Sequence, residues 1–356
     1  MAYTKRDCVL MAMRRQEPQA VPFEFMLSPA LKKQFSEKYG TSDYQSYFGM
    51  ATRQILPAAS QAKHDYRGYY RQPLPPGTRF TEWGVACTPG SLSHFVRMEH
   101  PMVDMESPAE IEAYPFPDLD GPLRFAKMNQ HVESVKKSGY AAVAHMEMTI
   151  FECAWYLRSM DQLLIDMYTN NKMAVVLLDR ITAVREAQAA GYAQAGVDII
   201  RLGDDVGTQK AMLMDPDMWR KLLKPRLAKV ITAAKSVNPQ VLVFYHSDGN
   251  ILPIIPDLIE IGVDILNPIQ PECMDPAELK RMYGDKLSFW GTIGTQTTMP
   301  FGTPDDVRRE VRDRIATVGK GGGLFLAPSH ILEPEVPWPN IEAFAEAVWE
   351  YGTSYR

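Results

Sequence analysis

The stretch VLVFYHSDGN, residues 241–250, runs five apolar or aromatic residues into His246 and then into a polar turn. Continuous apolar runs of this kind are typical of strands in a parallel sheet that is covered on both faces. Longer segments with apolar residues at helical spacing separate such runs, which return at residues 21–26, 140–148, 197–203, 263–268, 287–293 and 323–328. This alternation predicts an α/β fold with a parallel sheet.

A barrel and an open doubly wound sheet both fit this alternation. An open dinucleotide-binding sheet needs a glycine-rich loop after its first strand, and residues 27–35 contain no glycine. The predicted strands end instead in polar or charged residues, which are unfavourable in an apolar core. These are Glu147, Asp204, Asp205, His246, Asp248, Gln270, Glu272, Gln296 and His330. Active sites of (β/α)8 barrels lie at the carboxyl ends of the strands. We therefore predict a (β/α)8 TIM barrel.

The predicted barrel lacks one strand, because the sequence shows seven apolar runs. We expect the missing strand within residues 50–110. In that region RFTEWGVACTPGSLSHFVRMEHP, residues 79–101, has the pattern of a hairpin insertion. The chain is predicted to form a single domain over residues 1–356.

Composition excludes several classes of partner. The 356 residues are 46% hydrophobic and 23% charged, with a formal net charge of -5 and no block of like charge, which disfavours nucleic acid and anionic membranes. Neither a secretory signal nor a spanning segment is apparent, so we expect a cytoplasmic protein. The four cysteines are far apart in the chain, which argues against a disulfide framework or a thiolate-only zinc site.

A metal site is predicted at the strand ends. His246 and Asp248 face the same side of their strand, because alternate residues of a strand share a face. A zinc site with one open position needs three protein ligands. We expect His246, Asp248 and His330 as these ligands, with Glu272 and Cys273 in reserve. Alternatively, His246 is a hydrogen-bonded side chain at a strand end, and Asp248 caps the following helix.

Carboxylates at two other strand ends are candidates for acid–base chemistry. Asp204 and Asp205 directly follow an apolar run, and one of them could orient a substrate or act as a base. Alternatively, they cap a turn or pair with Arg201. Glu147 could face the barrel mouth, or it could be a salt-bridge partner.

Several side chains are candidates for the wall of a substrate pocket. They are Tyr245, Trp290, Met146, Met148 and, at a strand end, Gln270. Aromatic and methionine side chains often line ligand pockets, but they are also common in a plain core. Periodicity leaves both alternatives open.

Four longer stretches resemble the uroporphyrinogen decarboxylase superfamily. They are GDDVGTQKAMLMDPDMWRKLLKPRL (203–227), FYHSDGNILPIIPDLIEIGVDILNPIQPECMDPAELKRMYG (244–284), LSFWGTIGTQTTMPFGTPDDVRREV (287–311) and GGGLFLAPSHILEPEVPWPNIEAF (321–344). The resemblance implies a distorted (β/α)8 barrel. The superfamily includes uroporphyrinogen decarboxylases, zinc-dependent corrinoid:coenzyme M methyltransferases and substrate-demethylating methyltransferases of anaerobic corrinoid systems. The fold alone does not distinguish these activities.

The decarboxylase branch is disfavoured by one motif. True uroporphyrinogen decarboxylases carry an arginine-rich R-Q-A-G-R motif just after the first strand, which holds the acidic arms of the porphyrinogen. The corresponding place here reads FMLSPALKKQF, residues 25–35, and contains no arginine. The resemblance therefore favours the methyltransferase branch.

The methyltransferases of this superfamily hold zinc with a histidine, a cysteine two residues later and a distant cysteine in an S-P-G-C-like segment. In this chain His246, Asp248 and His330 occupy these positions. Nitrogen and oxygen ligands make the metal a harder Lewis acid than thiolates do. A harder metal suits an ether oxygen. Because the pocket candidates Tyr245, Trp290, Met146 and Met148 are apolar and aromatic, the expected methyl donor is a small methoxylated aromatic compound.

The resemblance thus implies a zinc-dependent methyltransferase that catalyses O-demethylation and passes the methyl group to a Co(I) corrinoid (cobalamin). The chain has no D-x-H-x-x-G run, so the corrinoid is expected on a separate partner protein. The resemblance also allows for a homodimer. Two alternatives remain, a metal-independent decarboxylase and a non-catalytic tetrapyrrole- or corrinoid-binding protein.

Overall fold

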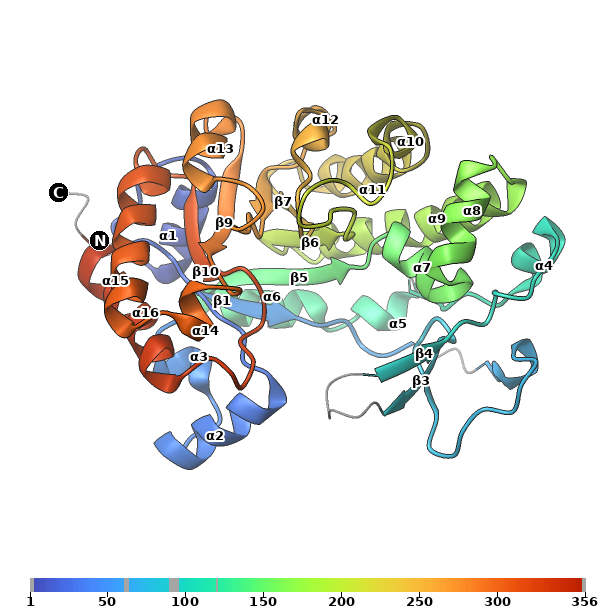
Figure 1. Ribbon diagram of the computed structural model, residues 1–356, viewed down its shortest axis with the longest axis horizontal. Helices are drawn as coiled ribbons and strands as arrows, with labels where there is room; N and C mark the ends of the chain where they lie inside the picture. The colour runs from blue at the N-terminus through green and yellow to red at the C-terminus, as the bar shows by residue number, and fades with distance from the viewer. Residues whose placement is uncertain (1–2, 61–63, 90–95, 120, 354–356) are drawn as a thin grey trace.

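A parallel sheet forms the centre of the computed structural model, which describes residues 3–60, 64–89, 96–119 and 121–353. The sheet curls around its own interior, with helices outside it (Figure 1). Its seven strands follow one another in the order β1 (Thr52–Ile55), β5 (Ala141–Glu147), β6 (Ile199–Gly203), β7 (Leu242–His246), β8 (Ile265–Asn267), β9 (Ser288–Ile293) and β10 (Leu324–Pro328). The strand expected within residues 50–110 is therefore β1.

Residues 21–27 take the eighth position of the barrel. They form no regular strand but run parallel to β10 through two isolated bridges, Phe23 with Leu326 and Leu27 with Leu332. No backbone bridge joins this segment to β1 in the described ranges; a side-chain hydrogen bond of 2.7 Å from Thr52 Oγ1 to Glu24 Oε2 spans the gap. The predicted (β/α)8 TIM barrel is confirmed, with a distortion at this closure.

Helices connect the strands and cover the outer face of the sheet (Figure 1). Several begin at a proline, which is favoured in the first helical turn because its missing N–H would have no helical partner there. The helices are α1 (Lys5–Met13), α2 (Pro29–Tyr39), α3 (Tyr44–Tyr47), α4 (Pro108–Ala113), α5 (Pro122–Phe125), α6 (Met128–Lys137), α7 (Phe151–Arg158), α8 (Met160–Tyr168), α9 (Lys172–Gln194), α10 (Pro216–Leu222), α11 (Lys224–Val237), α12 (Ile255–Glu260), α13 (Pro276–Tyr283), α14 (Thr298–Phe301), α15 (Pro304–Arg314) and α16 (Trp338–Tyr351). No helix in these ranges combines the length and the hydropathy of a membrane span.

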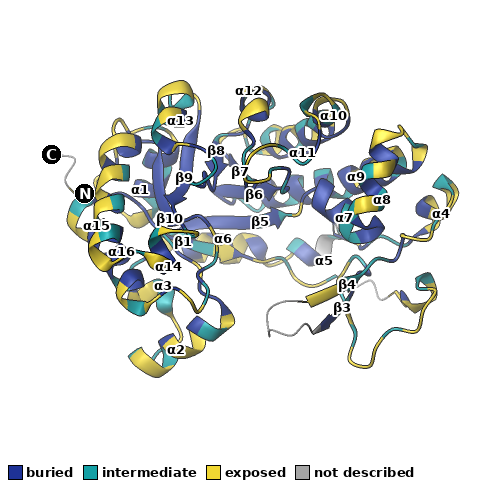
Figure 2. Cartoon of the chain, viewed as in Figure 1, coloured by how far each residue is buried: buried dark blue, intermediate teal, exposed yellow. Residues whose placement is uncertain are grey.

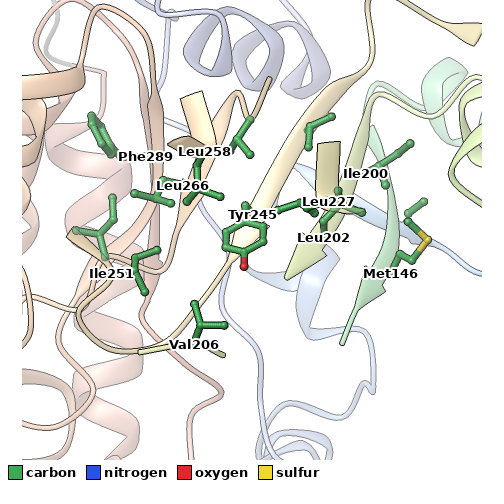
Figure 3. Packing of buried hydrophobic residues seen from close by; sticks show 14 of the residues in the cluster. Met146, Ile200, Leu202, Val206, Leu227, Tyr245, Ile251, Leu258, Leu266 and Phe289 are labelled. Atoms are coloured by element: carbon green, nitrogen blue, oxygen red, sulfur yellow. The ribbon is translucent and has the colours of Figure 1, made fainter. Parts of the chain in front are cut away.

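Alternation along the strands creates two separate cores. The outer face of the sheet packs against the helices, and Figure 3 shows Met146, Leu202 and Tyr245 in this layer. The inner face forms a smaller core with α1, made of Val9, Ala12, Met13, Ala51, Ala141, Val143, Ile199, Leu242, Phe244, Ile265, Trp290, Phe325 and Ala327. Nearly all of the sheet is therefore buried, as the dark strands of Figure 2 show.

Helix α1 closes the amino-terminal end of the barrel. Its buried side chains join the inner core, and its last carbonyl groups bond to the strands around it. The amide of Gly323 donates to Ala12 O at 2.9 Å, and Ser288 Oγ donates to Met13 O at the same distance. The opposite, carboxyl-terminal end of the barrel is left for the polar residues.

The predicted insertion is a small antiparallel sheet of β2 (Arg79–Phe80), β3 (Ala86–Pro89) and β4 (Val96–Glu99). This confirms the expected hairpin over residues 79–101, although its residues 90–95 lie outside the described ranges. The segment that follows is attached to the end of α7, because the amide of Met102 donates to Leu157 O at 2.9 Å.

A buried ion pair fixes this attachment. Arg158 Nε lies 2.9 Å from Asp166 Oδ2, and the two side chains are only 4% and 2% exposed. Arg158 also donates through Nη1 to Met105 O at 2.8 Å. The pair therefore ties α7, α8 and the segment after the insertion to one another.

Candidate active site at the barrel mouth

Four residues form one row across the carboxyl edge of the sheet. The strand register places Glu147 beside Gly203, Gly203 beside His246, and His246 beside Asn267. Glycine is required in this row, because a Cβ at Gly203 would lie 2.6 Å from His246 Cβ. The absence of a side chain at Gly203 lets His246 pack directly against this position.

Three potential metal ligands converge beside this row. One ligand atom each of Asp205, His246 and Asp248 lies within 4.8 Å of the other two. His246 Nε2 is 3.5 Å from Asp205 Oδ1 and 3.9 Å from Asp248 Oδ1. Two of the expected ligands are therefore together, and Asp205, which the sequence suggested as a catalytic carboxylate, joins them. His330 lies outside this group.

Asn267 fixes the tautomer of His246. The Asn267 amide donates through Nδ2 to Trp290 O at 2.8 Å, so its Oδ1 faces the imidazole. Since His246 Nδ1 lies 2.6 Å from this acceptor oxygen, Nδ1 must carry the proton. In the neutral imidazole, Nε2 then carries the lone pair, which is directed at the two carboxylates; this is the form of histidine that binds a metal.

The carboxylates of the group also fit a cation. Asp248 Oδ1 is buried and has no hydrogen-bond partner among the described residues. Burial raises the pKa of Asp248, His246 lowers it, and the nearby Asp205 carboxylate raises it again. A divalent cation would compensate for both the missing partner and the repulsion between the carboxylates. The donor set of one imidazole and two carboxylates suits zinc with an open position.

Replacing Asn267 by leucine is expected to lower zinc affinity by roughly 10- to 100-fold, the usual effect of removing an outer-shell partner. Without the acceptor oxygen, the Nδ1–H tautomer of His246 is no longer enforced. Competition with a chromophoric zinc chelator would measure the change. Asn340→Leu is the matched control, because Asn340 is equally buried but donates to the carbonyls of Met299 and Gly302, away from the site. Equal zinc affinity in the two variants would contradict this role of Asn267.

Asp204 has a structural position, as one of the sequence alternatives suggested. Its carboxylate accepts the backbone amides of Ile150 and Glu152 at 3.0 and 2.9 Å, just before and within the first turn of α7. Burial raises the pKa of Asp204 to about 7, although these N–H groups lower it. Within the described ranges, Arg201 pairs with neither Asp204 nor Asp205 but with Glu24 and Glu147.

Glu152 is a site residue that the sequence reasoning missed. Its Oε2 accepts the amide of Asp205 at 3.1 Å and so helps to hold this candidate ligand. Burial, followed by the charges of Asp204 and Asp205, raises the pKa of Glu152 to about 9. Glu152 lies in a helix rather than at a strand end, so the search of the strand ends did not reach it.

Arg201 forms a buried triad with two carboxylates below the row. Its Nε lies 2.9 Å from Glu147 Oε1, and its Nη1 lies 3.2 Å from Glu24 Oε1. The guanidinium also lies 4.4 Å from the ring centroid of Phe244. Burial raises the pKa of Glu147, but Arg201, a hydrogen bond with His145 and the nearby His246 together outweigh it and hold this pKa well below its usual value. Charged residues inside the apolar runs VDIIRLG and VPFEFM were the available signal for Arg201 and Glu24.

A cavity of about 130 Å³ lies beside the Arg201 triad and His246; Asp205 and Asp248 do not line it. For comparison, an engineered cavity of about 150 Å³ takes one benzene molecule. Trp290 and the exposed His330, both predicted site residues, contribute to its wall. The lining residues are Glu24, Phe25, Met26, Glu147, Arg201, His246, Asn267, Trp290, Ala327, Pro328, Ser329 and His330.

The structure places two predicted pocket residues elsewhere. Tyr245 and Met146 lie on the outer face of the sheet, under the helices (Figure 3), because they alternate with the inward-facing His246 and Glu147. We therefore remove both from the candidate pocket. Met148 follows β5 and is 42% exposed at the mouth.

The remaining candidates hold the loops around the mouth. Gln270 Oε1 accepts the amide of Gly249 at 2.7 Å, and Cys273 Sγ lies 3.2 Å from Gln209 Oε1. Glu272 Oε1 accepts from the Thr297 hydroxyl at 3.2 Å and lines a different cavity of about 610 Å³. Neither reserve ligand, Glu272 or Cys273, is part of the three-residue metal group.

Comparison with known proteins agrees with this architecture. A methyltransferase structure from Methanosarcina mazei superimposes with a TM-score of 0.71 over 98% of this chain and 99% of that chain. The sequence identity in this pair is 19%, so the likeness supports the fold alone.

The proteins that are similar in sequence have two different activities. The methylcobamide:CoM methyltransferase MtaA of Methanosarcina barkeri is 30% identical over 174 residues, which are 49% of this chain and 48% of that protein. The matched region thus spans about half the length of this relative. The uroporphyrinogen decarboxylase of Pseudomonas fluorescens (strain Pf-5) is 25% identical over 257 residues, 70% of each chain.

The family itself is identified by a longer match. The family model described as Uroporphyrinogen decarboxylase (URO-D) matches residues 89–351, which is well over half of the chain. This match confirms the resemblance of the four longer stretches of sequence to this family. The chain belongs to the uroporphyrinogen decarboxylase family.

Proposed function

We propose that the chain is a zinc-dependent methyltransferase that passes a methyl group from a small methylated donor to the Co(I) corrinoid of a partner protein. The main support is the convergence of Asp205, His246 and Asp248, with the His246 lone pair directed at both carboxylates. The partial match to a methylcobamide:CoM methyltransferase agrees with this activity. Asp205 replaces His330 as the third ligand in this proposal.

Each residue at the mouth has a role in the proposal. Asp205, His246 and Asp248 would hold the zinc ion, and bound zinc supplies Lewis-acid chemistry toward an oxygen of the donor. Asn267 keeps His246 in the binding tautomer. The indole of Trp290 lines the cavity in which the donor lies. A cavity of about 130 Å³ supports a donor with one aromatic ring, such as a methoxylated arene.

The corrinoid would approach from the carboxyl ends of the strands. The donor's methylated oxygen would then face His246 and its methyl carbon would face the mouth. There the corrinoid would accept the methyl group as the C–O bond breaks, and the electron pair of this bond would stay on the donor oxygen. Two side chains at this rim, Met26 and Met148, are each 42% exposed and offer apolar surface to the partner. Methionine adapts its shape to different partners, which suits a surface that a second protein covers only transiently.

The direct test mixes zinc-loaded protein, cob(I)alamin and 2-methoxyphenol without oxygen. We expect the absorbance of methylcobalamin to appear, to stop after chelation, and to return when zinc is added. The reaction without protein gives the background rate. Release of carbon dioxide from a small acid without corrinoid would instead favour the decarboxylase alternative. Stable binding of cobalamin with no turnover would favour a binding protein.

A further inference from the structure

Arg201 has hydrogen-bond donors to spare. Its side chain is 6% exposed, and its Nε and Nη1 atoms pair with Glu147 and Glu24. A guanidinium has five N–H donors. Among the residues that the structure describes, none accepts a hydrogen bond from Arg201 Nη2. This atom is not completely buried. Because Arg201 lines the 130 Å³ cavity, its unused donors can reach a molecule held there.

The charge around Arg201 restricts what this molecule can be. One guanidinium faces two carboxylates, Glu147 and Glu24, so these three groups have a formal charge of -1. His145 Nδ1 also lies 3.5 Å from Glu147 Oε2, and it leaves this charge unchanged while its imidazole is neutral. A ligand carboxylate would add a third negative charge to a buried site, which is strongly unfavourable. A hydroxyl group fits better, because it accepts a hydrogen bond from Arg201 and donates one to a carboxylate.

The triad lies at a suitable distance from the metal ligands. Glu147 and His246 are on strands separated by β6, so their backbones are about 10 Å apart at the usual strand spacing. Both residues line the 130 Å³ cavity. One ring bridges this space if its methylated oxygen faces His246 and a neighbouring substituent faces Arg201 and Glu147.

We propose that Arg201 and Glu147 bind a free hydroxyl group next to the methylated oxygen, so that the protein selects neutral donors of the methoxyphenol class and rejects those with a carboxylate in that place. Arg201 donates to the hydroxyl oxygen, and the hydroxyl donates to Glu147. Glu24 holds the other side of the guanidinium. This inference rests on the proposed function, which places the methylated oxygen beside His246.

Calorimetric titration of the zinc-loaded protein with three probes tests the inference. We expect 2-methoxyphenol to bind about tenfold more tightly than anisole, or better. Anisole lacks the hydroxyl group and therefore leaves the buried Arg201 and Glu147 without this hydrogen-bond partner. No binding of 2-methoxybenzoate is expected. Glu147→Gln removes one negative charge with little change in shape. It should therefore lower the affinity for 2-methoxyphenol by about tenfold and permit 2-methoxybenzoate to bind.

Glu310→Gln is the matched control. Glu310 pairs with Arg314 and is 13% exposed, the same as Glu24, but it lies outside the 130 Å³ cavity. This variant should leave the affinities for all three probes unchanged. If Glu147→Gln fails to fold, Glu24→Gln removes the other charge of the triad. Because Glu24 does not bind the hydroxyl group, this variant should permit 2-methoxybenzoate to bind but change the affinity for 2-methoxyphenol much less.

Equal affinities for 2-methoxyphenol and anisole, tight binding of 2-methoxybenzoate by the wild type, or no binding of any probe would overturn the inference. The methyl-transfer assay, run in parallel, separates this failure from that of the proposed function. Transfer from anisole as fast as from 2-methoxyphenol would overturn the inference alone. The expected order of binding without any methyl transfer would support the hydroxyl site and contradict the proposed methyltransferase.

Discussion

Replacing His246 by alanine is expected to remove zinc from the protein and to lower methyl transfer by well over 100-fold. Loss of a residue that only hydrogen-bonds to a metal ligand costs up to roughly 100-fold, and His246 is itself a ligand in the proposed site. His246 supplies the imidazole in the group, and without it two carboxylates face each other at a half-buried position. Elemental analysis of protein purified without chelator would measure the zinc content. Wild-type protein should hold about one ion per chain, in line with one three-ligand site.

His330→Ala is the informative control, because His330 was the ligand expected from the sequence. In the structure it lines the cavity but lies outside the three-residue group. This variant should therefore retain its zinc. If His330→Ala lost zinc as completely as His246→Ala, and Asp205→Ala kept it, the ligand set would be His246, Asp248 and His330 instead.

Replacing Asp166 by alanine is expected to lower the free energy of unfolding by about 3–5 kcal/mol, the usual result when one partner of a buried ion pair is removed. The change leaves the guanidinium of Arg158 buried without its carboxylate. It also removes the acceptor of the side-chain amides of Gln162 and Asn171. Urea unfolding followed by circular dichroism would measure the loss.

The control for this experiment is an exposed ion pair. Asp217 pairs with Arg220 at 2.9 Å, but its side chain is 88% exposed. Asp217→Ala should therefore cost less than about 1 kcal/mol. A similar, small loss in both variants would show that Arg158 finds water or another acceptor when Asp166 is absent.

The barrel could be predicted from the sequence because six of its strands are continuous apolar runs and their polar residues follow at one end. There are two exceptions. Strand β1 has the sequence TRQI and was expected only somewhere within residues 50–110. The segment expected as a strand over residues 21–26 makes only isolated bridges, at Phe23 and at Leu27 just beyond it. The alternation of side chains along a strand was a further signal in the sequence. Tyr245 and His246 are neighbours, so they cannot both face the barrel interior, and the choice of Tyr245 as a pocket residue disagreed with that of His246 as a ligand.

The partnership of Asp205 with Asp248 could not be predicted, because it depends on a contact between two loops. A Cβ at Gly207 would lie 2.5 Å from Asp248 O, and one at Gly249 would lie 2.6 Å from the carbonyl carbon of Gly207. This close approach lets the amide of Asp248 donate to Asp205 Oδ1 at 2.8 Å. Local periodicity describes each strand end alone and gives no information about which loops touch.

Helix α1 has a consequence for the order of events in the proposed methyl transfer. Because α1 fills the amino-terminal end of the barrel, the described residues leave the carboxyl-terminal end as the route to the cavity beside His246. If the corrinoid protein docks on that end, it covers the route by which the donor enters. The donor must then bind first, and the demethylated product can leave only after the partner has dissociated. Steady-state kinetics of such an enzyme would be sequential with a compulsory order, and excess corrinoid protein would inhibit it by trapping the unloaded form.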